Sequence, residues 1–453
     1  MEEALLEAGR KQLKRRKKDK QPTIFILSMR QLLIACVALA AALPAAAQTT
    51  KEEMLASPEK TAGVYYAYPA PESTDHYTKA PKGYTPFYIS HFGRHGSRYL
   101  ISDSEYTNPM ETLERADKAG ALSPLGKDAL KRLHEIYAEA AGRNEDLSPL
   151  GVRQHRGVAE RMFTAFPEVF KGDRSIEARS SVVLRCAMSM AAFGDQLKEL
   201  NPKLKISYES SQKYMPYLTG RTDEANAFCG KKGIWRAAYN NFRASQTNAD
   251  RFIAALFADK QYAKQYVESK ELMWQFYWVA ADLQNMETPI RLYDLFTSEE
   301  LFDLWQCFNY QFYSTCANHA DSNGSVRDSS KPLLRNIIES ADAAIANPSQ
   351  AATLRFAHDS NITPLAALMG IETYDVAWRE PETLYQHWTD FKVSPMCANL
   401  QIVFFNKKGG TTDDILVKVL LNEHEVHIPV ATTQFPYYRW TDVRAYYANV
   451  VGM

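Results

Sequence analysis

The sequence predicts an α/β protein with a mainly parallel central sheet, flanking helices and a mainly helical inserted lobe. Three observations favour this fold class. A short apolar run, a cluster of polar residues and a helical pattern follow one another in this order three times. The stretch from residue 200 to residue 340 is dominated by helical patterns. A segment near the C-terminus has the composition and the glycine-rich turn of an antiparallel hairpin.

The first half of the chain supplies two of the three repeated patterns. "TPFYIS", residues 85–90, is predicted to be a buried strand, and residues 108–142 are predicted to be helical. A further helix is expected after Ser148 as N-cap, with Pro149 at its first position. Residues 175–181, "SIEARSS", form the second predicted strand, and the helical segment "VVLRCAMSMAAFGDQLKEL" follows it directly.

The second half begins with the mostly helical residues 205–345 and then repeats the pattern. Thr353–Ala357 is predicted to be a strand, and Asn361 and Pro364 are expected to open the next helix. Residues 399–428 form the predicted hairpin. We therefore expect an α/β domain assembled from residues 48–200 and 340–453, with residues 200–340 inserted as a helical lobe over the active site.

Residues 1–47 are expected to lie outside the fold. A basic residue, an apolar run and the small residues Ala45–Ala47 resemble an export signal that starts at Met29 and is cleaved before Gln48. Residues 1–28 then belong to an over-extended gene model or to an unusually long basic leader. Two alternatives are a lipid anchor at Cys36 and an uncleaved anchor. The interpretation implies an exported protein, periplasmic or secreted, with no membrane span after cleavage.

The net charge and the cysteine spacing exclude some classes of partner and of metal site. Residues 1–47 hold nine of the 53 basic residues and four of the 53 acidic ones, so the remainder carries a net charge of −5. A mildly acidic body argues against nucleic acid as the main partner. The five remaining cysteines, none of which forms a Cys-x-x-Cys pair, are Cys186, Cys229, Cys307, Cys316 and Cys397. We expect no structural zinc site; up to two disulfides or buried free thiols remain open.

Polar clusters stand at the ends of all three predicted strands. The first runs from His91 to Arg98, the second is Arg179-Ser180-Ser181, and the third is His358-Asp359-Ser360-Asn361. In an open α/β sheet, ligands bind at the carboxyl ends of parallel strands. If the three strands are neighbours, three arginines, two histidines and one aspartate meet at one point.

This set of residues suits phosphoryl transfer without a metal or other cofactor. Arginine forks bind phosphate oxygens in a bidentate manner. A neutral histidine attacks phosphorus to form a phosphoramidate, and a protonated aspartate delivers a proton to the departing alkoxide. The arginines and the second histidine would stabilise charge on the oxygens in the transition state. Gly96 would allow a tight turn beside the nucleophile.

"RHGSR" followed by a distant "HDSN" resembles the histidine phosphatase superfamily, in the branch of acid phosphatases, phytases and multiple inositol polyphosphate phosphatases. "LSPLGVRQHRGVAERM" and "EARSSVVLRCAMSMAAF" are similar to further segments of that family. The resemblance covers roughly residues 84–200 and 350–430. It implies a phosphomonoester hydrolase with a small-molecule substrate, most specifically an inositol phosphate such as phytate.

Residue by residue, the resemblance implies His95 as the phosphorylated nucleophile and Asp359 as the proton donor. It implies that the phosphate is held by Arg94, Arg98, Arg179 and His358. The chain departs from the family pattern at Leu100, where proline is common, and at Ser181, where threonine is common. The "HDSN" motif is closer to bacterial acid phosphatases and phytases than to the His-Ala-Glu of inositol polyphosphate phosphatases, which leaves the substrate within the branch open.

Several residues carry two interpretations. His91 either contacts substrate or points away from the site, Arg185 is expected to form a salt bridge, and His155 is expected on the helix surface or behind the site. His424 and His427 are not expected to bind metal, and the aromatic group around Trp274 is expected to be core. Lys231, Lys232 and Arg236 either line a polyphosphate pocket or face solvent. The rival functions are a general acid phosphatase, a phosphate-binding protein without turnover and a phosphomutase.

Overall fold

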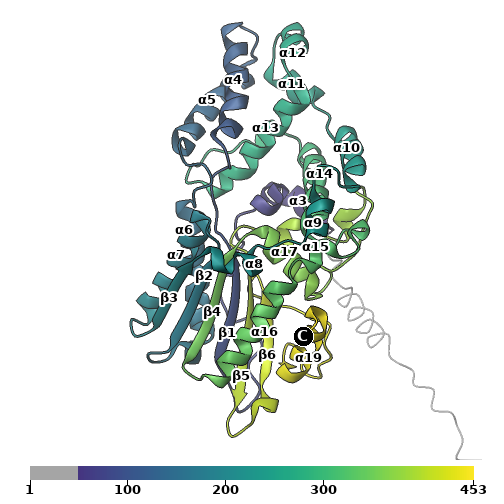
Figure 1. Cartoon of the computed structure of the whole chain (residues 1–453). Coiled ribbons are helices and arrows are strands. Elements are labelled where there is room, and N and C mark those ends of the chain that lie inside the picture. Colours follow the sequence, from purple (N-terminus) through teal and green to yellow (C-terminus); the bar gives the residue numbers. More distant parts are fainter. Residues whose placement is uncertain (1–48) are drawn as a thin grey trace, which may run out of the picture. The chain divides into compact units, whose positions relative to one another are not determined.

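The computed structural model describes residues 49–453, which form one compact unit from residue 50 onward. The predicted export signal, with Met29, Cys36 and the cleavage site after Ala47, lies outside the described residues. The division at residues 200 and 340 stays a prediction. Two helices from residues 103–140 contact helices from the predicted insertion, so both segments contribute to the helical region in the upper part of Figure 1.

In the described part of the chain, eight strands form one sheet in the order β3-β2-β4-β1-β5-β6-β7, with β8 paired to β6. The first four strands of this order are parallel, and the C-terminal strands extend the sheet in the antiparallel sense. The predicted α/β class and the predicted C-terminal hairpin are thereby confirmed. The strands are β1 Tyr84–Arg94, β2 Ser175–Ser180, β3 Lys205–Ser210, β4 Gln350–Ala357, β5 Asn399–Lys407, β6 Leu416–Leu421, β7 His424–Glu425 and β8 Tyr438–Arg439.

The helices and short 3-10 turns cover the sheet and build the helical region. The α-helices are α3 Thr50–Ala56, α4 Asp103–Lys118, α5 Pro124–Ala140, α6 Pro149–Ala165, α7 Leu184–Leu200, α8 Met215–Leu218, α9 Asp223–Cys229, α10 Trp235–Gln246, α11 Asp250–Leu256, α12 Lys260–Tyr266, α13 Ser269–Asp282, α14 Ser298–Cys316, α15 Ser325–Asp328, α16 Lys331–Ala346, α17 Asp359–Leu368, α18 Asp390–Val393 and α19 Trp440–Val451. The 3-10 turns used below are η1 Pro58–Tyr65, η4 Leu283–Asn285 and η5 Tyr293–Leu295.

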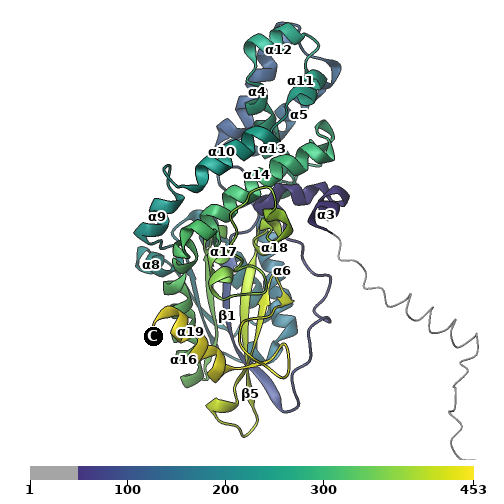
Figure 2. The ribbon, with the colours of Figure 1, turned by 90° about the vertical axis from the view of Figure 1, so that its right-hand side faces the viewer.

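Two helical layers enclose the sheet (Figures 1 and 2). Helices α6 and α7 lie on one face, where a core cluster that includes Ile89, Val158 and Phe193 is buried. Helices α16 and α19 contact each other on the other side, and α16 also contacts β1 and β4. Both faces of β1 and β4 are covered, so these two central strands are buried along most of their length.

Three local expectations are corrected. Strand β3 lies in the stretch predicted to be helical; it is an exposed edge strand with polar residues, so it lacks the apolar run by which buried strands are recognised. Helix α17 begins at Asp359, with His358 at the N-cap, and Pro364 lies inside it. The predicted helix 108–142 is two helices, separated at Gly120, whose φ of +66° favours glycine.

Candidate active site

The three polar clusters meet because their strands are neighbours in the order β2-β4-β1. Arg94, the last residue of β1, is in register with Ala357 at the end of β4, and Ser180 of β2 is in register with Phe356. The His95 amide donates to the Ala357 carbonyl at 3.0 Å. The rings of His95 and His358 consequently lie with their centroids 5.6 Å apart. The predicted convergence of the strand ends is therefore present.

The hydrogen bond of His95 defines its tautomer. Its Nδ1 lies 2.9 Å from the Gly96 carbonyl oxygen, which can only accept, so Nδ1 carries the proton and Nε2 keeps a free electron pair. Burial, together with the charges of Arg94 and Arg185, lowers the pKa of His95 well below its usual value. The imidazole is therefore neutral at mildly acidic pH, which is the state that a nucleophilic nitrogen requires.

Close contact between two glycines fixes the backbone beside His95. A Cβ atom on Gly96 would lie 2.6 Å from the Gly151 carbonyl oxygen, and one on Gly151 would lie 2.3 Å from the Ser97 carbonyl oxygen. Ser148 caps α6 and its hydroxyl also donates to the Ser97 carbonyl at 3.1 Å. The segment "LSPLG" thus brings the first turn of α6 against the nucleophile loop, and glycine is needed on both sides of the contact.

Two arginines of the motif are buried beside His95. Nη1 of Arg94 donates to the carbonyls of Val64 at 2.5 Å and Ser394 at 2.8 Å, and its Nη2 forms an ion pair with Asp359 at 2.9 Å. Arg98 donates to the Tyr99 carbonyl at 2.7 Å and to the Tyr65 hydroxyl at 3.1 Å, with its guanidinium 4.9 Å from the centre of the Tyr65 ring. Most of these partners are neutral, so the positive charge remains available to an anion.

His358 and Asp359 are placed by the junction of β4 and α17. Burial is the main reason why the pKa of His358 is lowered to about 4, so this ring is also neutral. Asp359 is 22% exposed, and its Oδ1 accepts from the Ser360 amide at 2.7 Å. Burial raises the pKa of Asp359, but Arg94, His358 and Arg98 outweigh burial and lower it below its usual value. In the free protein Asp359 is consequently a carboxylate held by Arg94.

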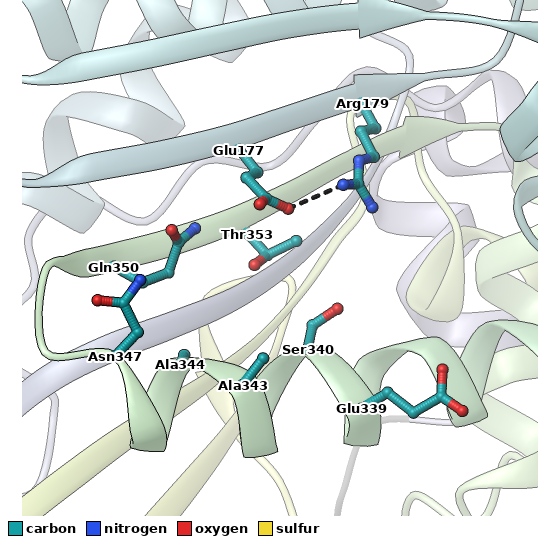
Figure 3. Close-up of a pocket in the computed structure, with 9 residues that line it drawn as sticks. All are labelled: Glu177, Arg179, Glu339, Ser340, Ala343, Ala344, Asn347, Gln350 and Thr353. Atoms are coloured by element: carbon teal, nitrogen blue, oxygen red, sulfur yellow. Dashed lines mark hydrogen bonds and ion pairs between the residues drawn. The ribbon is translucent and has the colours of Figure 1, made fainter.

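Arg179 is not brought into this cluster. Its Nη2 donates to Glu177 at 3.0 Å, its Nε lies 3.8 Å from Glu209, and its guanidinium lies over the ring of Tyr214. Figure 3 shows Arg179 and Glu177 along one wall of a pocket of about 280 Å³ whose opposite wall is α16. The reason is the pleat of β2: successive side chains point to opposite faces, and Arg179 points to the face covered by α16.

Arg185, unlike Arg179, acts on this cluster, because its charge is among those that lower the pKa of His95 and of His358. It lies in the first turn of α7, after the loop that follows β2, and is 11% exposed. The adjacent Cys186 has its Sγ 3.2 Å from the Ala357 carbonyl and 3.8 Å from Nε2 of His358. Arg185 also pairs with Glu145 at 2.6 Å, so the expected salt bridge is present as well. The signal that could have identified it is its position in a helix start directly after a strand end, which borders the ligand site of an open sheet.

Comparison with known proteins gives this site a family. The model of the histidine phosphatase superfamily (branch 2) matches residues 93–422, more than half of the chain. The chain belongs to this superfamily. Multiple inositol polyphosphate phosphatase 1 of Gallus gallus is 22% identical over 410 residues, which cover 83% of this chain and 84% of the relative. The predicted family membership is confirmed.

Solved structures share the fold of this histidine phosphatase. The multiple inositol polyphosphate phosphatase of Bifidobacterium longum in complex with inositol hexasulfate superposes with a TM-score of 0.73 at 18% identity, over 86% of this chain and 97% of that one. The phytase of D. castellii superposes with a TM-score of 0.68 at 16% identity, over 87% and 85% of the two chains.

The other candidate residues of this histidine phosphatase lie outside the cluster. His91 is buried between Phe193 and Phe356, so it points away from the strand ends. His155 is buried as well, with Nδ1 3.6 Å from Sγ of Cys397, and so lies behind the site rather than on the helix surface. His424 is exposed, and His427 stacks on Phe435. Within residues 49–453, no group of three or more His, Cys, Asp or Glu side chains could hold a metal ion.

The predicted insertion contributes core and surface residues. Trp274, Phe276 and Tyr277 belong to the main core cluster, as expected. Lys231 and Lys232 are exposed, whereas Arg236 donates to the carbonyls of Gly230 and Cys229. All five cysteines of the described part are free thiols. No helix among residues 49–453 is long and apolar enough to cross a membrane.

Proposed function

We propose that this histidine phosphatase hydrolyses phosphomonoesters through a covalent phosphohistidine at His95. The observation that carries the proposal is the hydrogen bond between Nδ1 of His95 and the Gly96 carbonyl, which leaves an unprotonated Nε2 among buried arginines. Such a nitrogen is a nucleophile, and the guanidinium groups of Arg94, Arg98 and Arg185 neutralise the charge that accumulates on a transferring phosphoryl group. Arg185 replaces Arg179 in the set that we propose to bind phosphate.

The first half of the reaction phosphorylates the enzyme. The electron pair of His95 Nε2 forms a bond to phosphorus while the bond between phosphorus and the ester oxygen breaks. Asp359 in its protonated form gives its proton to that oxygen, so the product leaves as an alcohol. His358 lies against the same phosphoryl group and donates a hydrogen bond to it. The proton of His95 stays on Nδ1, hydrogen-bonded to the Gly96 carbonyl, throughout.

The second half releases phosphate. A water molecule attacks the phosphorus atom, and the Asp359 carboxylate accepts a proton from this water. The P–N bond breaks, its electron pair returns to Nε2, and orthophosphate leaves. His95 returns to its neutral tautomer and Asp359 returns to its protonated form, so the cycle closes without a metal or other cofactor.

Asp359 must gain a proton before the first step, although Arg94 lowers its pKa in the free protein. A bound phosphomonoester brings negative charge next to the carboxylate and shares the same guanidinium, and both effects raise the pKa of Asp359. The proton is gained most readily at acidic pH. We therefore expect activity to be highest below neutral pH and to fall as the pH rises, and an optimum well above pH 8 would argue against Asp359 as donor.

Inositol phosphates, including phytate, are the substrates that we propose first. Support comes from the names of relatives, which are multiple inositol polyphosphate phosphatases and a phytase, and from the complex of one of them with inositol hexasulfate. A general acid phosphatase that acts on sugar phosphates is the alternative within the same chemistry. A phosphate-binding protein without turnover is disfavoured because binding alone requires neither a nucleophile nor a proton donor.

Export is proposed on the basis of the leader-like residues 29–47, with the periplasm or the medium as destination. Extracellular phytate-like substrates are compatible with such a location. The N-terminal sequence of the protein isolated from the producing cell tests this part of the proposal.

The decisive experiment measures phosphate release by the chain from Gln48 onward at pH 5 with EDTA. Phytate and p-nitrophenyl phosphate are compared for the natural protein and for His95→Ala, with His424→Ala as the exposed-histidine control. We expect release from both substrates, retained in His424→Ala and abolished in His95→Ala. Phosphate binding without release from either substrate would instead establish the non-catalytic alternative, and release unaffected by His95→Ala would exclude the phosphohistidine.

A further inference from the structure

A polar network from the helical region reaches the back of the "RHGSR" loop. Asn285 of η4 accepts from the Ser97 hydroxyl at 2.7 Å and donates to the Tyr65 carbonyl at 2.9 Å. Gln154 binds the amide and the hydroxyl of the same Ser97. The end of α13 and the following turn therefore hold the loop that carries Arg98.

Asp282, the last residue of α13, belongs to this network and is fully buried. Its Oδ2 accepts from the Tyr106 hydroxyl at 2.6 Å, and this hydroxyl accepts from the Leu100 amide at 2.9 Å. Leu100 lies two residues beyond Arg98, so the carboxyl group is linked through Tyr106 to the same loop. No hydrogen-bond partner within residues 49–453 is present for Oδ1 of Asp282 or for Nε of Arg98.

Asp282 and Arg98 also interact electrostatically. The pKa of Arg98 is raised: burial alone would lower it, but Tyr65 and Asp282 outweigh burial. Burial raises the pKa of Asp282 to about 7, against the smaller opposite effects of Tyr106, Arg98 and Asn285. A buried carboxyl group is thus linked through Tyr106 and Leu100 to the loop of an arginine that we assign to phosphate binding, and the two charges act on each other in a buried medium.

We propose that Asp282 is a positioning residue that controls how strongly Arg98 binds a phosphoryl group. When Asp282 is ionised it offsets the charge of Arg98, and when it is protonated Arg98 presents its full charge to the ligand. The inference rests on the proposed function, because it treats Arg98 as a ligand of phosphate. It adds a group from the helical region that never contacts the substrate.

Other ionisable groups around Asp282 leave this assignment intact. Glu105 of α4 raises its pKa slightly, and Tyr293 of η5 has its own pKa raised by burial, so it stays neutral. On the neighbouring helices α11 and α14, Arg251 and Glu300 pair with each other at 2.5 Å. Among residues 49–453, the titratable groups that act on Asp282, or on which it or Arg98 acts, include Arg98, Tyr65, Glu105, Tyr106, Tyr293 and, through Arg98, Asp359.

The test is sulfate binding by calorimetry between pH 5.5 and pH 8.5 at constant ionic strength. Sulfate stays a dianion over this range, so the ligand does not titrate. In the free protein the lowered pKa values keep His95 and His358 neutral and Asp359 ionised, and any proton that bound sulfate draws onto Asp359 is common to the natural protein and the variants. Asp282→Asn keeps the shape of the side chain and an oxygen acceptor for Tyr106 but removes the titration. Asp390→Asn is the matched control, because Asp390 is also buried, with a pKa raised to about 7 by burial, and is bound by Trp305 instead of an arginine.

We expect the Kd of the natural protein for sulfate to rise by roughly tenfold across this range, with a midpoint near neutral pH. In Asp282→Asn the Kd should rise much less across this range than in the natural protein, whereas Asp390→Asn should keep the full rise. If Asp282→Asn keeps the rise, or if Asp390→Asn abolishes it, the inference is overturned while the proposed function stands. Failure of the natural protein to bind sulfate at any pH would overturn the phosphate pocket itself and the inference with it.

Tyr106→Phe provides a second variant that leaves Asp282 in place. Loss of the Tyr106 hydrogen bond, which lowers the pKa of Asp282, should move the midpoint of the sulfate titration to higher pH. A purely structural role of this network would weaken binding by the same factor at every pH, without moving the midpoint, and that result would overturn the inference.

Discussion

Arg94 ends β1 and Arg179 lies near the end of β2, the two strands on either side of β4, but the surroundings of the two arginines differ. Arg94 is completely buried and is held by two carbonyl oxygens and Asp359. Arg179 is 21% exposed and lies between Glu177 and Glu209, over the ring of Tyr214. Arg94 has two neutral partners and one carboxylate, which we propose to be protonated in the reaction, so its charge becomes available to a ligand. Arg179 lies between two carboxylates that stay in place, so it has less charge to offer. The presence of an arginine near a strand end in the sequence does not by itself show which of these two environments it has.

The same contrast separates the two carboxyl groups Asp359 and Asp390. Each is held at the start of a helix, and each accepts a backbone amide. Arg94 lowers the pKa of Asp359, while burial without an arginine raises the pKa of Asp390 to about 7. Of the two carboxyl groups, only Asp359 lies next to an arginine that we propose to hold the substrate. Asp359 is therefore the one that can exchange a proton with that substrate.

The largest effect that tests this contrast is expected from Asp359→Asn. The variant keeps a hydrogen-bonding side chain beside Arg94 but has no proton to give. We expect kcat/KM for an alkyl phosphate to fall by about 10³, within the usual contribution of a general acid. The kcat/KM for p-nitrophenyl phosphate should fall much less, because its leaving group departs without protonation. Equal losses for both substrates, measured by steady-state kinetics at pH 5, would contradict the role of Asp359 as donor.

An intermediate effect is expected when the two arginines near β2 are compared. Arg185→Ala should lower kcat/KM by about 10², the typical cost of removing one donor that stabilises transition-state charge. Arg179→Ala should change kcat/KM by less than about threefold, because removal of a partly exposed ion pair costs little. Both variants remove a guanidinium from the same strand–helix unit, so each serves as the control for the other.

The reverse order of these losses would restore Arg179 to the site. Thermal unfolding curves recorded for both variants separate a loss of folding from a loss of catalysis. A loss in Arg179→Ala that disappears once its unfolded fraction is taken into account would still leave Arg185 as the residue that acts on the substrate.

The sheet and most of the candidate site could be predicted from the sequence because the signals that indicate them are local. The strands before His95 and His358 are apolar and end in polar clusters, and Ser148 and Pro149 mark the start of α6. Once these strands are assumed to be parallel neighbours, the convergence of His95, His358 and Asp359 follows from topology. The pairing of β2, β4 and β1 confirms that assumption.

The features that the sequence did not predict depend on the direction of side chains and on contacts between segments far apart in the chain. The choice between Arg179 and Arg185 required the last residue of β2 and the first turn of α7 to be known to within one residue, and a shift of one residue reverses the face. The contact of Gly96 with Gly151 and the approach of Asp282 to the "RHGSR" loop join segments far apart in the chain. The edge strand β3 was not predicted because its residues are mostly polar and show no apolar pattern.

The smallest expected effect is on the stability of the fold, and it tests whether burial without a neighbouring arginine raises the pKa of Asp390. Folding raises its pKa from 3.8 to about 7, so its contribution to stability is complete below about pH 4 and is lost as the pH rises to about 7. Asp390→Asn removes this titration but keeps an oxygen for the Trp305 and Phe391 N–H groups. Between pH 5 and pH 8, we expect the Tm of the variant to fall by about 2–5 °C less than that of the natural protein. Calorimetric melting at both pH values measures the difference. Parallel Tm curves would show that Asp390 is already ionised in the folded protein throughout this range, and that burial without a guanidinium does not raise its pKa into the range.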